Sequence, residues 1–227
     1  MIVAIDGPAG SGKTTTARSV AERLGFVHID TGAMYRAVTL QVLRDGVSLD
    51  DDTTIIGTAK RVRIELKRTE DGVLRTLLNG DDVTHDIRES RVDMHVSRVS
   101  EIAGVRDEIV RQQRELGRNV DAVMEGRDIG TVVFPDAEVK VYLVASVEER
   151  AKRRQKELTL RGVNHDLADV LADIQRRDQH DSTRAVAPLK PAPDAIWIDT
   201  TSKSIDEQVD EVIRLVDKRR RSEREAT

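Results

Sequence analysis

The chain has 227 residues, of which 38% are hydrophobic and 34% are charged. This balance is typical of a soluble globular protein and excludes a largely disordered chain, which lacks the apolar surface needed to fold. The 41 acidic residues outnumber the 37 basic ones, so the net charge of -4 provides no general positive field for nucleic acid or an anionic membrane.

The N-terminal part of the sequence alternates between strand and helix patterns. The apolar run 2–5 stops at Asp6-Gly7-Pro8, which is typical of a buried strand that enters a turn. A helical stretch then follows Gly12 and ends at Gly25, where glycine favours termination. A short strand over 27–29 and a helical pattern from Met34 come next. This alternation predicts a parallel sheet that is covered by helices on both faces.

The region from about residue 60 to residue 85 has a different period. Val62, Ile64 and Leu66 alternate with charged residues, which is the pattern of a half-buried strand. Asp71-Gly72 and Asn79-Gly80 are hairpin-turn dipeptides on either side of a further apolar stretch. We therefore predict a small antiparallel meander inserted into the α/β chain.

The second half of the chain returns to alternating strands and helices. After a helical region that ends near Gly117, buried strands are predicted at 122–124 and 139–144, and a last strand is predicted at 196–198. Capping boxes are predicted to start two helices, Ser146-Val147-Glu148-Glu149 and Ser204-Ile205-Asp206-Glu207. The charged tail from 218 to 227 is expected to fray.

A phosphate-binding loop is the most specific motif in the sequence. It matches G-x-x-x-x-G-K-[ST] between a predicted strand and a predicted helix, as that motif requires. Its glycines let backbone N–H groups face phosphate oxygens, Lys13 reaches the β and γ phosphates of ATP, and Thr14 ligates Mg²⁺. A glycine-rich turn that merely joins strand to helix is the alternative. The predicted nucleotide-binding residues are Gly7, Pro8, Ala9, Gly10, Ser11, Gly12, Lys13, Thr14 and Thr15.

Several classes of protein are disfavoured by what the sequence lacks. It has no cysteine, which excludes disulfides and cysteine-based metal sites, and its five histidines show no paired metal-ligand spacing. It offers five aromatic residues for stacking on bases, fewer than a single-strand nucleic-acid binder uses. Without a long apolar run or a leader pattern at its start, the protein is expected to be cytoplasmic, with no membrane or nucleic-acid partner.

Three further segments, taken with the phosphate loop, closely resemble bacterial cytidylate kinases. They are Asp30-Thr31-Gly32-Ala33-Met34-Tyr35-Arg36, Glu125-Gly126-Arg127-Asp128-Ile129-Gly130-Thr131 and the stretch from Arg177 to Leu189. The resemblance covers most of the chain. It implies transfer of the γ-phosphoryl group of ATP to CMP or dCMP, with Mg²⁺ as cofactor, by a protein that is a monomer.

The resemblance also implies a domain organisation. The fold is a phosphate-loop α/β fold with a five-stranded parallel sheet flanked by helices, a small antiparallel monophosphate-binding insert and a helical lid. The expected parts are a core over 1–37, a monophosphate-binding region over 38–104 with its insert near 60–85, core again over 105–149, a lid over 150–165, and core with the C-terminal helix over 166–227.

Residue roles carry over where the sequence matches the family. The resemblance implies catalytic roles for Lys13, Arg127, Arg184 and Arg153, the last within a lid that also holds Arg154 and Arg161. It implies that the CMP phosphate is bound by Arg36, Arg127 and Arg184 with Thr31 and Tyr35 nearby. It assigns cytosine to Ser97, Arg106 and Asp128, and the sugar to Arg177 and Asp181. Glu125 stands where some members of the family have aspartate, and a carboxylate of either residue could hold metal-bound water.

Simpler interpretations of the same residues remain open at this point. Arg36 could be solvated, Arg127-Asp128 could be a surface ion pair, and the basic helix 150–161 could be a solvated face. Two other functions also remain open. One is a kinase acting on UMP, AMP or a metabolite hydroxyl, and the other is a non-catalytic ATP-binding regulator that docks on nucleic acid.

Overall fold

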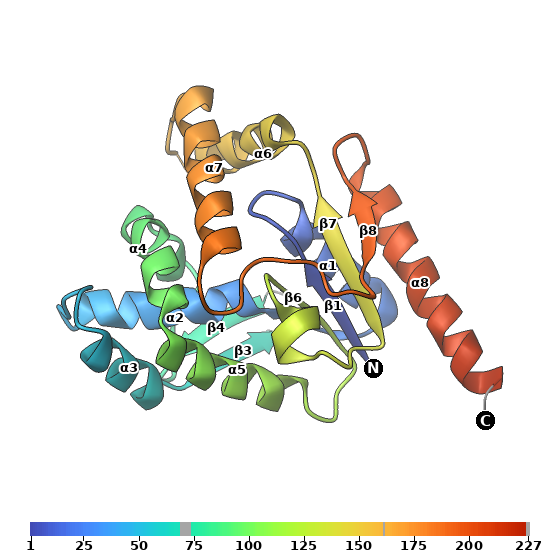
Figure 1. The fold of residues 1–227 in the computed structure, drawn as a ribbon, viewed down its shortest axis with the longest axis horizontal. Coiled ribbons are helices and arrows are strands. Elements are labelled where there is room, and N and C mark those ends of the chain that lie inside the picture. Colours follow the sequence, from blue (N-terminus) through green and yellow to red (C-terminus); the bar gives the residue numbers. More distant parts are fainter. Residues whose placement is uncertain (69–73, 161, 226–227) are drawn as a thin grey trace. The chain divides into compact units, whose positions relative to one another are not determined.

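A computed structural model of the chain describes residues 1–68, 74–160 and 162–225 (Figure 1). The chain divides into two compact units: unit 1 is Met1–His28 with Asn119–Thr227, and unit 2 is Ile29–Arg118. The predicted turn at Asp71-Gly72 and the lid residue Arg161 lie outside the described residues. Within the described part of the chain, no helix combines the length and apolar composition that a membrane-spanning segment needs.

Unit 1 is built on the predicted parallel sheet, which has five strands in the order β2-β6-β1-β7-β8. Strand β1 lies in the centre and pairs in parallel with both β6 and β7, and its last residue, Asp6, lies opposite Gly126. The carboxyl ends of these strands therefore meet at one edge of the sheet, where ligands bind in open α/β folds. The strands are β1 Ile2–Asp6, β2 Val27–Asp30, β6 Ala122–Gly126, β7 Val139–Val144 and β8 Ile196–Asp199.

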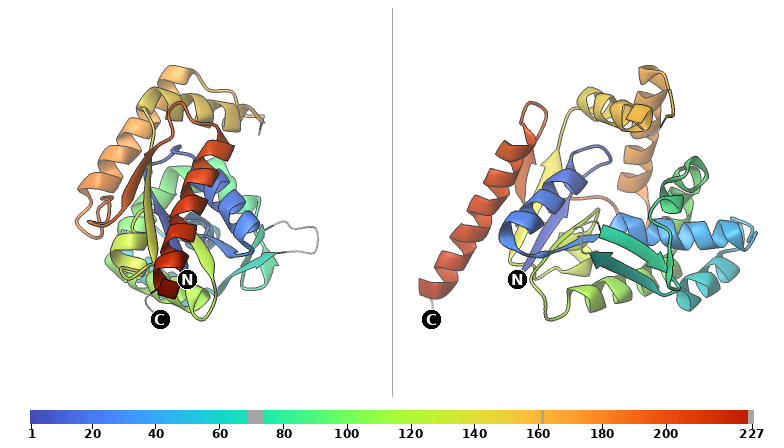
Figure 2. Two further views of the ribbon diagram at one scale, coloured as in Figure 1. Left: turned by 90° about the vertical axis from the view of Figure 1, so that its right-hand side faces the viewer. Right: turned by 180° about the vertical axis from the view of Figure 1, so that it is seen from behind.

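Helices α1 and α8 cover one face of this sheet (Figure 2). Val3 and Ile5 of β1 are fully buried in one apolar cluster with Val20 of α1 and with Val209 and Val212 of α8. Alternation along the strand directs the neighbouring side chains, including Asp6, to the opposite face. The helices of unit 1 are α1 Lys13–Leu24, α6 Val147–Leu160, α7 Leu167–Thr183 and α8 Ile205–Glu225, with a single π-helical turn, η2, at Ile129–Val133.

One of the two predicted capping boxes forms completely. At the start of α8, the Ser204 backbone N–H donates to Glu207 Oε2 at 2.7 Å and the Glu207 N–H donates back to Ser204 Oγ at 3.3 Å. At the start of α6, Glu149 donates to Ser146 Oγ, but the Ser146 N–H donates to Thr201 Oγ1 instead. The second box is therefore half formed, because a residue distant in sequence supplies the other acceptor.

The C-terminal tail differs from its prediction. Helix α8 continues to Glu225 rather than fraying from residue 218. One contact from this extension is Arg220, whose guanidinium lies 5.1 Å from the ring centroid of Phe26. Such a cation–π contact stabilises the last turns of α8, beyond the buried Val216.

Unit 2 contains the predicted antiparallel insert, a three-stranded sheet in the order β3-β4-β5. The β4–β5 turn is formed by Asn79 and Gly80, which have φ values of 53° and 96°, as the type I′ hairpin predicted from this dipeptide requires. The core of unit 2 is apolar and includes Met34, Leu40 and Ile109. The elements are α2 Thr31–Arg44, α3 Asp52–Arg61, β3 Ile64–Arg68, β4 Leu74–Leu78, β5 Asp81–Asp82, a 3₁₀ turn at Asp86–Arg88, α4 Ser90–Glu101 and α5 Ala103–Gly117.

The parallel sheet flanked by helices and the small antiparallel sheet confirm the predicted fold class. Unit 2 contains the region 38–104 that was expected to bind the monophosphate, and it extends beyond that region at both ends.

Candidate active site

The phosphate-binding loop joins β1 to α1, as its motif requires. Gly7, Gly10 and Gly12 have φ values of 150°, 75° and 94°, a region that residues with a side chain rarely adopt. A Cβ atom on Gly7 would lie 2.2 Å from the carbonyl oxygen of Leu143. The loop conformation therefore depends on glycine at positions where both the backbone angles and the close packing exclude other residues.

Lys13 begins α1 and turns back over this loop. Its Nζ donates to the carbonyl oxygen of Pro8 at 2.6 Å and to Ser11 Oγ at 3.4 Å. Burial lowers the pKa of Lys13, and the nearby charge of Arg127 lowers it further, against the opposing charges of Glu125 and Asp6. Two cations held close together in a buried site are stabilised when an anion enters, so this arrangement favours a bound phosphate.

Thr14 and Glu125 provide hard oxygen atoms beside the loop. Thr14 Oγ1 donates to Glu125 Oε2 at 2.8 Å, and Glu125 Oε1 lies 3.0 Å from Nε2 of His28. Thr14 is exposed, whereas Glu125 is 3% exposed. A hydroxyl and a carboxylate are the donors that Mg²⁺ prefers, so these residues fit the metal that the motif predicts.

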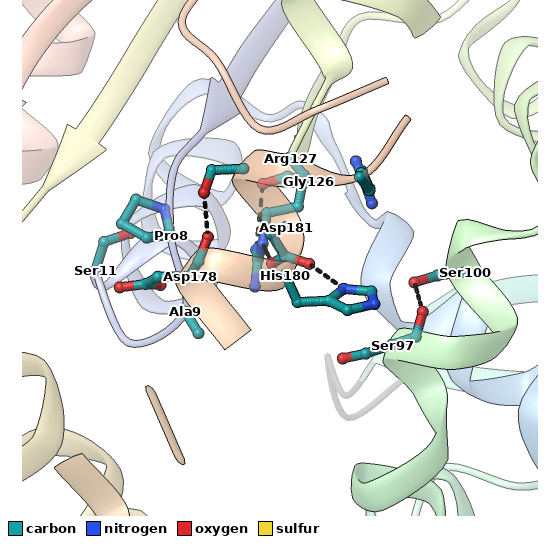
Figure 3. A network of polar contacts seen from close by, with 12 residues as sticks. Pro8, Ala9, Ser11, Ser97, Ser100, Gly126, Arg127, Asp178, His180 and Asp181 are labelled. Carbon is teal, nitrogen blue, oxygen red and sulfur yellow. Dashed lines mark hydrogen bonds and ion pairs between the residues drawn. The ribbon is translucent and has the colours of Figure 1, made fainter. Parts of the chain in front are cut away.

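Arg127 follows β6 and forms an ion pair with Asp181 of α7 (Figure 3). Its Nε donates to Asp181 Oδ2 at 2.9 Å, and the two side chains are 22% and 10% exposed. Burial opposes ionisation of Asp181, but the charge and hydrogen bond of Arg127 outweigh it and hold the pKa of that carboxyl below its usual value. Arg127 thus pairs across the unit with Asp181, and the alternative of a surface ion pair with Asp128 is wrong.

Other predicted residues of unit 1 lie around this pair. Asp128 is 4% exposed, and the charges of Arg177 and Arg184 also lower the pKa of Asp181. The Nε of Arg184 donates to the carbonyl oxygen of Ala187 at 2.6 Å. Unit 1 therefore brings Arg127, Arg177, Asp181 and Arg184 into one charged cluster.

Arg153 also lies against the phosphate loop. It donates to both Thr200 Oγ1 and the Thr200 carbonyl oxygen, at 3.0 and 2.6 Å, and Thr200 Oγ1 donates to the carbonyl oxygen of Ser11. A Cβ atom on Gly12 would lie 3.6 Å from Nη1 of Arg153. The guanidinium of Arg153 is thus held next to the nucleotide loop.

The remaining predicted residues belong to unit 2. Arg106 is 3% exposed, and its guanidinium lies 5.5 Å from the Tyr35 ring centroid and donates to the carbonyl oxygen of Ser100 at 3.3 Å. Ser100 Oγ in turn donates to the carbonyl oxygen of Ser97 at 3.0 Å (Figure 3). Unit 2 therefore brings Tyr35, Ser97 and Arg106 together.

Arg36 and Thr31 occupy separate positions on α2. Arg36 pairs with Asp93 at 2.6 Å and donates to the Ile87 carbonyl oxygen at 3.1 Å, so the alternative that it is merely solvated is wrong. Thr31 is the first residue of α2 and is 3% exposed. Both side chains are therefore held in place by the fold of unit 2.

Asp6 organises the backbone that follows Asp128. Its two carboxylate oxygens accept hydrogen bonds from the N–H groups of Ile129 and Gly130, each at 2.8 Å. Burial raises the pKa of Asp6 to about 6, because these two hydrogen bonds offset only part of the desolvation penalty. Asp6 thus fixes the first turn of η2, and with it the backbone at Asp128.

The raised pKa makes Asp6 a source of pH-dependent stability. The pKa of Asp6 in the folded protein, about 6, exceeds the ordinary value of 3.8. The stabilisation of the folded state by protonated Asp6 is therefore complete below pH 3.8 and is lost as the pH rises through 6. Between pH 4.5 and pH 7 we expect the wild type to lose about 2 kcal/mol of unfolding free energy relative to Asp6→Asn. Urea unfolding of both proteins at the two pH values measures this difference, and an unchanged difference would show that Asp6 does not titrate in this range.

Sequence reasoning missed several residues that shape the site. Asp6 carried a usable signal, because it ends a strand at the ligand edge of the sheet. His28, Arg150 and Thr200 carried none, since their roles depend on partners far along the chain, at Glu125, Asp178 and Arg153.

The fold and the loop define a phosphate-loop nucleotide-binding protein, and the comparisons with known proteins identify it as a kinase. The sequence profile described as cytidylate kinase matches residues 3–218. The cytidylate kinase of Geobacillus sp. (strain WCH70) is 53% identical over 96% of both chains, and that of Anoxybacillus flavithermus (strain DSM 21510 / WK1) is 52% identical over the same shares. The structure of a gluconokinase from Sinorhizobium meliloti 1021 has a TM-score of 0.51 and 14% identity over 99% of this chain and 97% of its own, a likeness of fold alone.

The chain belongs to the cytidylate kinase family. It is therefore an enzyme of the ATP-dependent nucleoside monophosphate kinase class, and its phosphoryl donor is ATP. This membership confirms the resemblance that was identified from the sequence segments.

Proposed function

We propose that this protein transfers the γ-phosphoryl group of ATP to CMP or dCMP and so forms ADP with CDP or dCDP. The observation that carries the proposal is the placement of Lys13 over the phosphate loop and of Arg127 beside Asp181 in the same compact unit. Lys13 belongs to the loop that binds the donor, and Arg127 is expected to bind the acceptor phosphate. Both lie in unit 1, and the charge of Arg127 lowers the pKa of Lys13. Such a site favours two anions that must approach each other for phosphoryl transfer.

On the donor side, the loop from Gly7 to Thr15 binds the phosphates of ATP. Lys13 exchanges its bonds to Pro8 and Ser11 for the β and γ phosphates, and Arg153 neutralises further charge from beside Gly12. Thr14 would hold Mg²⁺, with Glu125 as a second oxygen ligand. The bound ion would supply positive charge at the phosphates.

On the acceptor side, the roles that the family resemblance implies assign three arginines to CMP. Arg36, Arg127 and Arg184 bind its phosphate, together with Thr31 and Tyr35. The cytosine is read by Ser97, Arg106 and Asp128, whose donors and acceptor match its carbonyl, ring nitrogen and amino group. Arg177 and Asp181 hold the sugar. Arg127 donates to Oδ2 of Asp181, and Oδ1 lies 4.0 Å from Nδ1 of His180. We propose that Oδ1 accepts a hydrogen bond from a sugar hydroxyl.

The chemistry requires no general base. The acceptor is a phosphate monoester whose second ionisation lies near pH 6, so its oxygen is already deprotonated at neutral pH. The main barrier is the repulsion between two anions, and the protein lowers it by aligning them and by surrounding them with fixed cations. We propose that the segment 150–165 acts as a lid that excludes water, since water would otherwise accept the phosphoryl group.

Two further properties belong to the proposal. The substrates implied by the family are small-molecule nucleotides. We propose that this enzyme acts on them in the cytoplasm as a monomer. Neither a membrane nor a nucleic acid is needed for the reaction.

A panel of acceptors tests this function. With ATP and Mg²⁺, we expect kcat/KM for CMP and dCMP to exceed that for AMP by about 100-fold or more, because AMP leaves the buried polar groups at the base unpaired. Coupled detection of ADP, with a reaction lacking acceptor as control, gives these values. Equal rates with AMP would contradict cytosine recognition, and no acceptor-dependent ADP would favour the non-catalytic regulator.

A further inference from the structure

Arg150 is a buried arginine in the basic helix for which a solvated face was the simpler alternative. It lies in the first turn of α6 and is 6% exposed, so that alternative is wrong for this residue. Its guanidinium contacts three separate segments of unit 1. Nε donates to the carbonyl oxygen of Ala145 at 3.1 Å, Nη1 donates to that of Ala9 at 3.1 Å, and Nη2 pairs with Asp178 Oδ2 at 2.6 Å.

Two of these partners belong to opposite sides of the proposed reaction. Ala9 is part of the phosphate loop, whereas Asp178 lies on α7 three residues before Asp181, on the same helical face. Figure 3 shows Asp178 beside Pro8 and Ala9, and Asp181 beside Arg127. One arginine therefore connects the loop that binds ATP to the helix that carries acceptor residues.

The packing around Arg150 leaves little room for adjustment. A Cβ atom on Gly10 would lie 3.0 Å from Cβ of Arg150 and 3.1 Å from its carbonyl oxygen. The second oxygen of Asp178, Oδ1, is buried and makes no hydrogen bond within the described part of the chain. The ion pair with Arg150 is thus the main restraint on that carboxylate.

We propose that Arg150 is a positioning residue that fixes the phosphate loop relative to α7, and thereby aligns the donor phosphates with the acceptor cations. Three of its five N–H donors bind protein oxygens, which suits a structural link better than a ligand contact. Misplacement of reacting groups by about 1 Å costs about 100-fold in rate, so such a link has a large effect on transfer. The proposal rests on the function proposed above.

The test compares Arg150→Lys and Arg150→Met with the wild type. Because the residues proposed to bind ATP and those proposed to bind CMP are unchanged, we expect KM for ATP and for CMP to change by less than about threefold. We expect kcat to fall by about 100-fold. We also expect a misaligned site to pass more phosphoryl groups to water, so that less CDP forms per ADP. The CDP:ADP ratio separates positioning from a purely structural role, which would lower stability and leave this ratio unchanged.

Two further variants keep the test decisive if the Arg150 variants fold poorly. Asp178→Asn keeps the shape of the side chain and the bond from Arg150 to Ala9, so a smaller loss of kcat and of the CDP:ADP ratio is expected. The matched control is Arg176→Met on the same helix, since Arg176 is 70% exposed and pairs only locally with Asp173. It should keep both values.

The outcomes separate the two proposals. A wild type that forms no CDP from CMP would overturn the proposed function itself. Wild-type kcat and a wild-type CDP:ADP ratio in Asp178→Asn and in folded Arg150 variants would overturn the positioning role alone. A loss in Arg176→Met equal to that in Asp178→Asn would also overturn it.

Discussion

A Lys13→Met variant is expected to fold normally and to lose CDP formation by about 10³-fold, the scale on which single charge-stabilising groups act in phosphoryl transfer. Methionine keeps the unbranched apolar stem of the buried side chain, one atom shorter, and removes the ammonium that would otherwise bind the β and γ phosphates. Burial already lowers the pKa of Lys13, so its charge is costly in the absence of an anion. Removing that charge should therefore leave the free energy of unfolding unchanged or increased.

Chromatographic measurement of CDP and urea unfolding check the two halves of this expectation. Lys218→Met is a suitable control, because Lys218 is an exposed lysine on α8 in the same unit. A folded Lys13→Met enzyme with more than a tenth of the wild-type rate would contradict the assigned role. A large loss of stability would instead show that the bonds from Lys13 to Pro8 and Ser11 hold the loop together.

The sequence predicted best those features that depend on neighbouring residues. The phosphate loop was identified because its fixed positions lie within one short segment between β1 and α1. The turn at Asn79-Gly80 was likewise predictable, since both residues tolerate the left-handed backbone that the turn requires. The alternation of strands and helices predicted the parallel sheet for the same reason.

Interactions between distant residues were predicted poorly. The adjacent residues Arg127 and Asp128 suggested an ion pair, yet the partner of Arg127 is Asp181, 54 residues further on. Both residues lie in the bend between β6 and η2, where adjacency in sequence does not show which acceptor either side chain reaches. Long, flexible arginine side chains reach many acceptors, and only the packing of elements decides which acceptor is near.

The basic helix α6 combines a feature that local sequence predicted with contacts to distant residues that it did not predict. Helical spacing predicted a charged face, but it did not indicate that α7 and the phosphate loop pack against its first turn. Arg150 is therefore buried against Ala9 and Asp178, whereas Lys152 is exposed. The partial capping box at Ser146 has a related cause, because Thr201 provides an acceptor that no local pattern could reveal.

An Arg127→Met variant is expected to lose both stability and activity. Breaking the pair with Asp181 leaves a largely buried carboxylate without its main partner, which costs about 3 kcal/mol of unfolding free energy. The same change removes a cation that we propose binds the CMP phosphate, so kcat/KM for CMP should fall by about 10³-fold. Urea unfolding and initial rates measured over a range of CMP concentrations give the two values.

The double variant Arg127→Met/Asp181→Asn separates these two losses. Replacing Asp181 by the neutral asparagine removes the orphaned charge, so most of the lost stability should return. Activity should not return, because the phosphate still lacks its cation and the sugar has lost a carboxylate acceptor. If the double variant remained as unstable as Arg127→Met, the ion pair would not be the source of the stability. Recovery of kcat/KM would show that Arg127 serves only to neutralise Asp181.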